Sequence, residues 1–312
     1  MKTKIKIGTR GSQLALYQAE FVKDRILAHF PMLDVSLAVI KTSGDMIRRG
    51  SFDPFITKRI FTKEIEDALI AGEVDLGVHS AKDMSVDLPD SLEISTVMER
   101  EDPRDCLISK EKQKISELPL GARIGTSSIR RKLQLLRWND HLTIEDVRGN
   151  VDTRIKKIEE GMVDAIVLAH AGVKRLGLGN YVSEIFPGDT FYPSPCQGII
   201  ALENRKDDTE LKEILRDINH SESFTQLECE RAFLKRLEGG CQLPCGITTE
   251  LQKDKLKIAG ALFAIESRNW VETSFEGSLK NPQEAGFQLA EMILDQGGKE
   301  ILNEIKKSRE KN

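Results

Sequence analysis

The chain has 312 residues, a length that favours two or three domains over a single hydrophobic core. Its composition, 39% hydrophobic and 31% charged, is typical of a globular protein, and a formal net charge of −4 gives no indication of a nucleic-acid or membrane partner. No run of about 18 apolar residues occurs, and the N-terminal stretch MKTKIKIGTRGS lacks the apolar core of a signal peptide. We therefore expect a cytoplasmic protein without a transmembrane helix.

Strand-like and helical segments alternate through the first two thirds of the chain. Helical periodicity is clearest at 12–30, where Ser12 is the expected N-cap and one apolar face is formed by Ala15, Ala19, Val22 and Ile26. It recurs at 63–73 and 130–138. The strand-like runs lie at 5–9, 35–42, 75–80, 92–98, 122–127, 142–147, 165–172 and 198–204. Such alternation predicts α/β domains with parallel sheets covered by helices.

Two stretches without periodicity interrupt this pattern, EREDPRD at 99–105 and FYPSPCQG at 191–198. We interpret them as crossovers between two α/β domains, with hinges at 99–103 and 193–198 and a cleft between the domains. The first domain would comprise residues 1–98 and 199–216, and the second residues 104–192. From residue 221 a helix ending in glycines, a hairpin and a final amphipathic helix predict a third, α+β domain over 221–312.

The stretch LEGGCQLPCG contains two of the five cysteines, Cys241 and Cys245. A chain without a signal peptide is expected in a reducing compartment, where disulfides are rare. A single C-x₃-C pair without a nearby histidine disfavours zinc, and the spacing is not that of a thioredoxin-like C-x-x-C motif. Two interpretations remain open from these residues: a glycine C-cap followed by a half-buried thiol, or a nucleophile with an exposed thiolate.

The stretch DLGVHSAKDMS carries an apolar strand into polar residues at 79–83. Catalytic groups of open α/β sheets lie at the carboxyl ends of strands, where Asp83 beside Lys82 is suited to proton transfer or to stabilising a cation. The alternative for Asp83 is an N-cap or an ion pair within the loop. For His79 we favour a core histidine that donates to a carbonyl.

In the stretch GTSSIRRKLQLLR, residues with hydroxyl side chains connect the end of a predicted strand to the start of a predicted helix. Ser127, Ser128 and the free backbone N–H groups of a helix N-terminus form an anion site. Arg130 and Arg131 in the first turn oppose the helix dipole, which favours compensation by an external anion over a solvated basic turn. Further cations follow other strands: Arg10, Lys82, Arg148, Arg154 and Arg175. If these strand ends share one cleft, its ligand carries several carboxylates or phosphates; any one arginine alone would fit a surface ion pair.

Taken together, the motifs resemble those of the porphobilinogen deaminase family, over nearly the whole chain and in family order. They are GTRGSQLAL, KTSGD, FTKEIEDAL, DLGVHSAKD, EREDPRD, GTSSIRRKLQL, VRGNVDTR, AGVKRLGL, CQGIIALE and EGGCQLP. The resemblance implies two lobes like those of type II periplasmic binding proteins, with a hinged cleft, plus a smaller α+β C-terminal domain. It also implies a transferase that joins four porphobilinogen molecules head to tail, releasing ammonia. The product would be the linear tetrapyrrole hydroxymethylbilane, passed from a monomeric enzyme to a uroporphyrinogen-forming enzyme.

The resemblance also implies roles for individual residues. Cys241 matches the cysteine that forms a thioether to a dipyrromethane cofactor, itself made from the substrate, and Asp83 matches the catalytic aspartate. Residues implied to bind the cofactor are Lys82, Ser127, Ser128, Arg130, Arg131 and Arg154. Residues implied to bind substrate are Arg10, Lys58, Phe61, Arg148 and Arg175. No metal, nucleotide, nucleic acid or membrane is implied.

Three positions depart from the family pattern. The loop at Ile56-Thr57-Lys58-Arg59 has β-branched residues where glycines are usual, and Ser85 replaces a frequent proline. Cys196 stands where the family usually has glycine, so a positive φ there would strain the hinge. Two competing hypotheses are a binding protein of the same two-lobed fold, which would not need Cys241, and a paralogue that carries the cofactor but elongates poorly.

Overall fold

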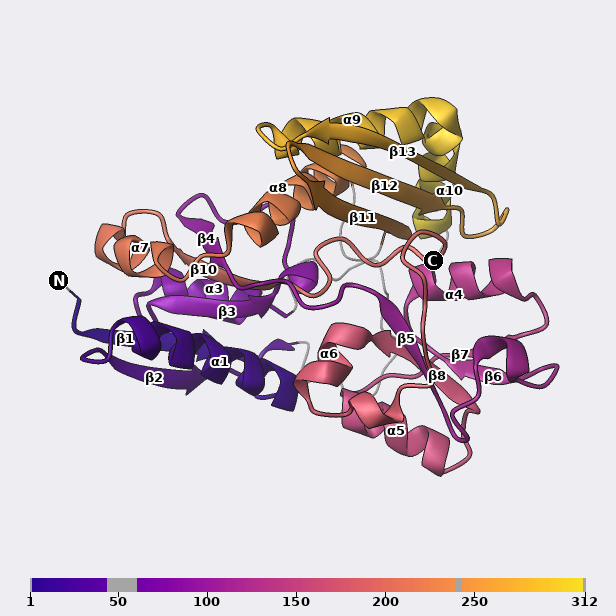
Figure 1. Cartoon of the computed structure of the whole chain (residues 1–312), viewed down its shortest axis with the longest axis horizontal. Coiled ribbons are helices and arrows are strands. Elements are labelled where there is room, and N and C mark those ends of the chain that lie inside the picture. The colour runs from indigo at the N-terminus through magenta and orange to yellow at the C-terminus, as the bar shows by residue number, and fades with distance from the viewer. Residues whose placement is uncertain (1, 44–60, 239–242, 311–312) are drawn as a thin grey trace. The chain divides into compact units, whose positions relative to one another are not determined.

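A computed structural model describes residues 2–43, 61–238 and 243–310 (Figure 1). The chain forms two compact units. The first unit comprises Met1–Glu101 and Gly198–Glu228, and the second comprises Asp102–Gln197 and Cys229–Asn312. The chain thus leaves the first unit and returns to it, in the regions where the two crossovers are predicted. No helix in these described ranges is long and apolar enough to cross a membrane.

The first unit is built on a five-stranded sheet in the order β2-β1-β3-β10-β4. β1 pairs in parallel with β2 and β3, whereas β10 runs antiparallel between β3 and β4, so the sheet is mixed rather than parallel throughout. The strands are β1 (Lys4–Thr9), β2 (Asp34–Val39), β3 (Leu76–Ser80), β4 (Leu92–Val97) and β10 (Ile200–Arg205). The helices are α1 (Gln13–His29), α3 (Lys63–Ile70), α7 (Thr209–Arg216) and the start of α8 (Ser221–Arg236).

The second unit repeats this sheet topology, in the order β7-β6-β8-β5-β9. β6 is parallel to β7 and β8, and β5 runs antiparallel between β8 and β9. The strands are β5 (Asp105–Ser109), β6 (Arg123–Gly125), β7 (Thr143–Glu145), β8 (Ala165–Ala169) and β9 (Glu184–Ile185), and the helices are α4 (Ile129–Trp138), α5 (Val151–Glu159) and α6 (His170–Arg175). The predicted α/β class, with two similar lobes and a smaller C-terminal domain, is confirmed.

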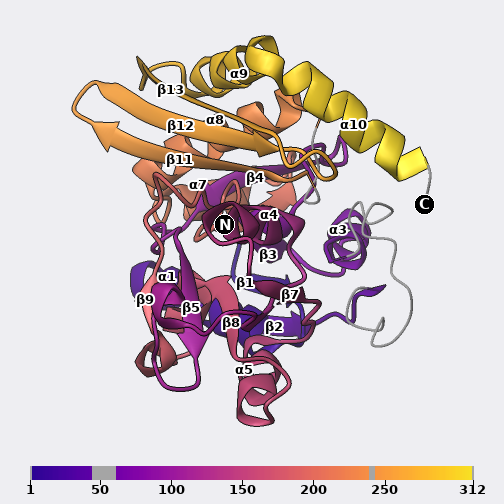
Figure 2. The same ribbon diagram turned by 90° about the vertical axis from the view of Figure 1, so that its right-hand side faces the viewer.

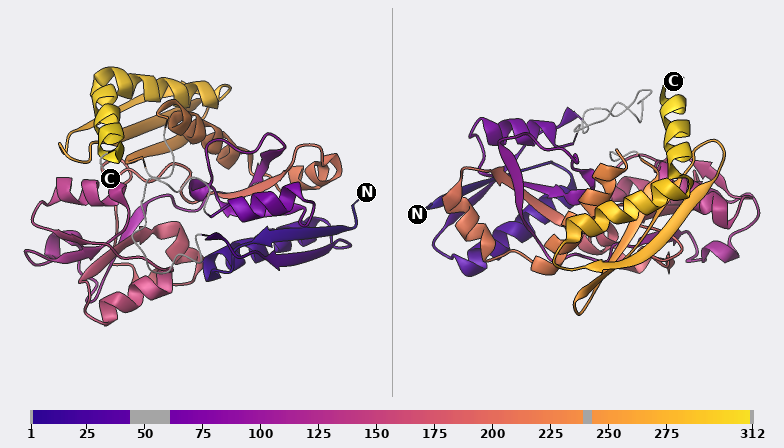
Figure 3. Two further views of the ribbon diagram at one scale, coloured as in Figure 1. Left: turned by 180° about the vertical axis from the view of Figure 1, so that it is seen from behind. Right: turned by 90° about the horizontal axis from the view of Figure 1, so that it is seen from above.

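The C-terminal part of the second unit is an antiparallel sheet in the order β11-β12-β13. Figures 2 and 3 show α9 along one face of this sheet, where the buried side chains of α8, α9 and α10 join those of the strands in one core. The elements are β11 (Cys245–Gln252), β12 (Lys255–Phe263), β13 (Trp270–Ser278), α9 (Pro282–Ile293) and α10 (Lys299–Glu310), with a π-helical turn over Leu294–Gly298 between the two helices. The predicted hairpin is therefore part of a three-stranded sheet.

Local sequence signals account for the helix ends. Ser12 caps α1 by accepting a hydrogen bond from the Ala15 backbone N–H at 3.3 Å, as predicted. α8 ends at Arg236 and Glu238 has a left-handed conformation (φ 52°), while the glycines predicted to end this helix lie outside the described residues. Cys196 also has a positive φ, 61°, which is the condition under which a cysteine there is strained. Its backbone N–H donates to the buried carboxylate of Glu230 at 2.5 Å.

Candidate active site

Two predicted site residues follow neighbouring strands of the first unit. Arg10 comes directly after β1, and β3 ends at Ser80, where a 3₁₀ turn over Ala81–Asp83 begins. Because β1 and β3 are parallel neighbours, their carboxyl ends lie at the same edge of the sheet. The fold therefore places the Arg10 cation and the Asp83 carboxylate side by side along that edge.

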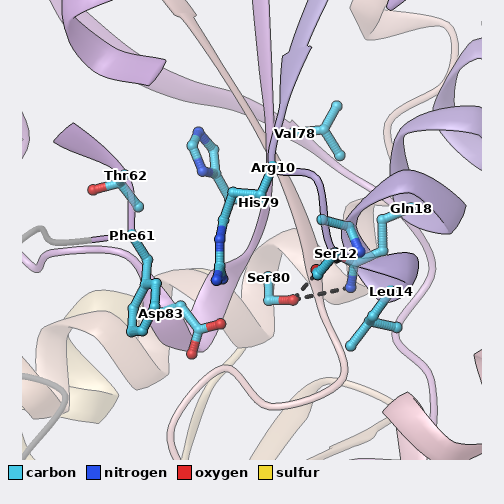
Figure 4. Close-up of a pocket in the computed structure, with 11 residues that line it drawn as sticks. Arg10, Ser12, Leu14, Gln18, Phe61, Thr62, Val78, His79, Ser80 and Asp83 are labelled. Carbon is cyan, nitrogen blue, oxygen red and sulfur yellow. Dashed lines mark hydrogen bonds between the residues drawn. The ribbon is translucent and has the colours of Figure 1, made fainter. Parts of the chain in front are cut away.

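Arg10, Phe61 and Asp83 line one small pocket of about 60 Å³ (Figure 4). The guanidinium carbon of Arg10 lies 4.3 Å from the centre of the Phe61 ring, within the range of a cation–π contact. Figure 4 shows the Arg10 guanidinium, the Phe61 ring and the Asp83 carboxylate gathered on one side of the pocket. A cation, an aromatic face and a carboxylate at this point suit a small aromatic ligand that bears both acidic and N–H groups.

A side-chain contact between α1 and β3 holds the strand that carries this site. Gln18 Nε2 donates to Ser80 Oγ at 2.9 Å (Figure 4), and Gln18 is 2% exposed. The Ala81 backbone N–H continues the strand contacts by donating to the Ile199 carbonyl at 3.0 Å. Sequence reasoning missed Gln18. The signal was present, because Gln18 is the one polar residue within the otherwise apolar stripe of α1.

His79 is buried as predicted, but its partner differs from the prediction. Its Nε2 lies 3.0 Å from a carboxylate oxygen of Glu203 on β10, and the side chains are 3% and 0% exposed. The group next to the imidazole is therefore a carboxylate rather than the expected carbonyl. His79 also lines the pocket that contains Asp83.

The second unit also places its predicted site residues after parallel strands. Ser127 and Ser128 follow β6, Arg148 follows β7, and α6, which ends at Arg175, follows β8. These three strands are adjacent and parallel, so the residues lie towards one edge of the sheet. Ser128 is the N-cap of α4 and accepts from the Arg131 backbone N–H at 3.4 Å.

Arg130 and Arg131 are buried and share one carboxylate within the protein. Asp105 is fully buried on β5. One of its carboxylate oxygens lies 2.8 Å from Arg130 Nη2, and the other lies 2.7 Å from Arg131 Nη2. Burial alone would raise the pKa of Asp105, but the two guanidiniums outweigh it and hold that pKa well below its usual range. Burial lowers the pKa of Arg130, and Asp105 opposes that effect. Asp105 thus supplies an internal anion that the sequence argument did not foresee.

The charges in this cluster do not cancel. Two guanidiniums face one carboxylate, and the Asp105 oxygen that pairs with Arg131 also accepts from Gln197 Nε2 at 2.9 Å. The cluster therefore retains a net charge of one positive unit behind the N-terminus of α4. Binding of an external anion there remains a prediction, and this excess charge supports it.

The remaining predicted cations differ in their surroundings. Arg148 is half exposed, and its Nε donates to Asp146 at 2.9 Å, whereas Arg154 Nε donates to the Gly149 carbonyl at 2.7 Å. Lys82 lies in the 3₁₀ turn next to Asp83. Lys58 and Cys241 lie outside the described residues. Their roles, like those of the other cations, stay predictions.

The described residues on both sides of Cys241 are anchored in the C-terminal core. Leu237 precedes Cys241, and Leu243 and Cys245 follow it, all three buried in the same apolar cluster. Cys245 is 1% exposed, so it is fully rather than half buried.

The thiol of Cys106 has a raised pKa of about 12. Burial is the main cause, and the negative charge of Asp105 adds to it, so this thiol is inert. The described residues contain no group of three or more His, Cys, Asp or Glu side chains that could hold a metal ion.

Comparison with protein-family models decides the family. Residues 5–213 match "Porphobilinogen deaminase, dipyromethane cofactor binding domain", and residues 224–295 match "Porphobilinogen deaminase, C-terminal domain". The chain belongs to the porphobilinogen deaminase family. Family members are transferases of tetrapyrrole synthesis that carry a dipyrromethane cofactor, and the sequence motifs predicted this membership.

Individual relatives agree over the full length. The porphobilinogen deaminase of Syntrophomonas wolfei is 44% identical, covering 97% of this chain and 99% of its own. That of Chlorobium limicola is 42% identical, covering 99% of this chain and all of its own. Among solved structures, the methionine-binding protein MetQ aligns with 73% of this chain and 95% of its own at 14% identity and a TM-score of 0.45. We draw no conclusion from a structural similarity this weak.

Proposed function

We propose that this chain condenses four porphobilinogen molecules head to tail, releasing ammonia at each step, to give hydroxymethylbilane. The observation that carries this proposal is the identity of 44% to a porphobilinogen deaminase over 97% of the chain. The pocket formed by Arg10, Phe61 and Asp83 supports it, because each porphobilinogen brings an aromatic ring, a ring N–H and two carboxylates.

Asp83 is the proposed catalytic residue. Loss of ammonia from porphobilinogen leaves an electron-poor azafulvene cation, and a carboxylate close to the pyrrole N–H stabilises that cation and accepts protons. Arg10 lies in the same pocket and binds a substrate carboxylate, while Phe61 packs against Arg10 and lines the pocket. Arg148, Arg175 and Lys58 are proposed to bind further substrate carboxylates.

The predicted cofactor-binding residues, which lie in the second unit except for Lys82 of the first, fit a cofactor that carries several carboxylates. Their donor set is cationic and hydroxylic, and the cluster around Asp105 keeps an excess positive charge. We assign the acidic groups of the dipyrromethane to Lys82, Ser127, Ser128, Arg130, Arg131 and Arg154, and its thioether to Cys241. When bound, the cofactor supplies the pyrrole carbon to which the first substrate is joined.

The remaining parts of the proposal concern the whole protein. We propose three domains, with residues 1–98 and 199–216 in the first, 104–192 in the second and 221–312 in the third, and hinges at 99–103 and 193–198. We propose a monomeric, cytoplasmic enzyme whose product goes to a uroporphyrinogen-forming enzyme, as its family membership suggests.

The intact mass of the purified protein tests the proposal. We expect an excess equal to two linked pyrroles, absent in the Cys241→Ser variant, and conversion of added porphobilinogen to a tetrapyrrole that cyclises to uroporphyrin. A protein that stays at the polypeptide mass after incubation with porphobilinogen would favour the alternative, a carboxylate-binding protein without chemistry. A protein that carries the cofactor but releases no tetrapyrrole would favour the paralogue that elongates poorly.

A further inference from the structure

A buried pair, His79 and Glu203, lies beside the Asp83 pocket and has no role in the site described above. His79 on β3 is one of the residues that line the pocket, and Glu203 on β10 lies 3.0 Å from the ring Nε2 of His79. Both side chains are excluded from solvent, at 3% and 0% exposure. The pair therefore connects the pocket to the interior of the sheet in the first unit.

The strand register shows how the imidazole is accommodated. Across the antiparallel β3–β10 ladder, Ala201 lies opposite His79, and Glu203 lies opposite Gly77. Gly77 and His79 share one face of β3, because side chains alternate along a strand. A Cβ atom at Gly77 would lie 2.7 Å from His79 Nε2 and 3.0 Å from the Ile65 side chain. The ring thus occupies space that exists because residue 77 is glycine.

The two side chains of the pair are in close contact without hydrogen-bond geometry. Neither His79 Nε2 nor either Glu203 carboxylate oxygen makes a hydrogen bond within the described part of the chain. Burying a carboxylate without donors is costly, and a pair of well-packed apolar side chains is often at least as stable as a buried ion pair. Fold stability is therefore a weak reason for having these two residues, and the place of His79 in the pocket lining is a stronger one.

We propose that His79 and Glu203 are positioning residues for the Asp83 pocket. Glu203 fixes the imidazole above Gly77, and the fixed imidazole sets the end of β3, from which the turn carrying Asp83 starts one residue after Ser80. This inference rests on the proposed function. It predicts that loss of either partner misplaces Asp83, which slows the chemical step while substrate binding by the cations is retained.

The test is a double-mutant cycle on the cofactor-loaded enzyme. His79→Ala and Glu203→Ala should each lower kcat by about tenfold to a hundredfold, because misplacing a catalytic group by about 1 Å has effects of that size. KM and the cofactor mass excess should stay unchanged. The double variant should lose no more than the worse single variant, because each single change already disables the pair. Glu203→Gln should recover part of kcat, because the amide has nearly the size and shape of the carboxylate and keeps the imidazole packed in place.

Two further variants complete the test. Gly77→Ala should lower kcat as His79→Ala does, because the added Cβ displaces the imidazole without touching Asp83. This variant replaces Glu203→Ala in the test if the Glu203→Ala protein does not fold. Lys212→Met is the matched control: it removes an ion pair with Glu93, 3.0 Å apart in the same unit, and should leave kcat unchanged. Unchanged kcat, additive losses in the cycle, or loss of the cofactor mass would overturn the positioning role. A wild-type protein that makes no tetrapyrrole would instead refute the proposed function.

Discussion

Asp83 is the residue on which the proposed chemistry depends most directly. Asp83→Asn keeps the size and shape of the side chain but removes the charge that would stabilise the azafulvene cation. We expect the variant to keep its cofactor and to lose kcat by roughly 10²–10⁴-fold, the usual contribution of an acid–base group. Single-turnover assays with porphobilinogen and the intact mass measure the two quantities separately.

The control for Asp83 lies in the same segment. Asp90 is exposed, so Asp90→Asn makes the same chemical change away from the pocket and should turn over like wild type. Equal activity of the Asp83→Asn and Asp90→Asn variants would show that Asp83 is not the catalytic residue.

Asp105 gives a prediction about stability rather than chemistry. Asp105→Asn leaves Arg130 and Arg131 buried without a counter-ion, and breaking a buried ion pair in this way typically costs about 3–5 kcal/mol. Urea unfolding measures the loss. Asp164→Asn removes a carboxylate from Arg123, 3.0 Å away at about 40% exposure, and should cost about 1 kcal/mol or less. Similar losses in both variants would mean that the Asp105 cluster is not the tight pair that its geometry indicates.

At the residue scale the sequence predicted which groups follow the strands but not what they contact. The sequence predicts an external anion as the partner of Arg130 and Arg131, because nothing in the local sequence links these two residues to Asp105, about 25 residues earlier. His79 was read as a core residue, which is correct for its burial, but its pairing with Glu203 depends on β10 returning to the first unit. Contacts that depend on such long-range strand pairing have no local sequence signature.

At the element scale the success of prediction followed the strength of the local pattern. The apolar stripe and N-cap of α1 fixed that helix to within a residue at each end. β5 was missed because its buried run, DCLIS, follows directly on the charged stretch that was read as a crossover. β11 was missed because polar residues, Thr248 to Glu250, interrupt its apolar alternation. Short strands and edge strands are recognised from their partners in the sheet, which the sequence does not display.

The packing of α9 on α8 gives a prediction at the same scale. A Cβ atom at Gly286 would lie 1.9 Å from the backbone carbonyl oxygen of Cys229, so the two helices approach closely only because residue 286 is glycine. Gly286→Ala must separate them, and overpacking of this kind costs about 1–3 kcal/mol or more. A lower thermal midpoint is the expected result.

Gly179→Ala is the matched control for that helix contact. Its Cβ would meet nothing within 4 Å, and its φ is not positive. The substitution should be neutral or stabilise by about 0.4–1 kcal/mol, because alanine restricts the unfolded chain. Equal thermal midpoints for the Gly286→Ala and Gly179→Ala proteins would show that α8 and α9 are less tightly packed than described.

At the scale of the whole molecule, two acidic residues at the start of the second unit link stability to pH. Asp105 is buried between arginines, and Asp102 receives hydrogen bonds from the Arg104 side chain at 2.7 Å and from its backbone N–H at 3.0 Å. His170 Nδ1 lies 3.0 Å from the same carboxylate. Burial would raise the pKa of Asp102, but these bonds outweigh it and lower that pKa to about 2. Both carboxyls thus favour the folded state in their ionised form.

The sign of the pH effect follows from the lowered pKa. The folded protein binds a proton at Asp102 less readily than the unfolded chain does, so the contribution is complete above the unfolded value of 3.8 and is lost as the pH falls towards 2. In a dry site that difference would be worth about 2 kcal/mol, and screening of this partly exposed cluster reduces it to about 1 kcal/mol. Asp102→Asn should therefore be less stable than wild type at pH 7, and its urea-unfolding free energy should converge with that of wild type near pH 2. A constant difference in unfolding free energy between the two proteins from pH 7 to pH 2 would show that protonation of Asp102 is not coupled to folding. Glu238→Gln, which removes an exposed ion pair with Lys306, should follow the wild-type curve throughout.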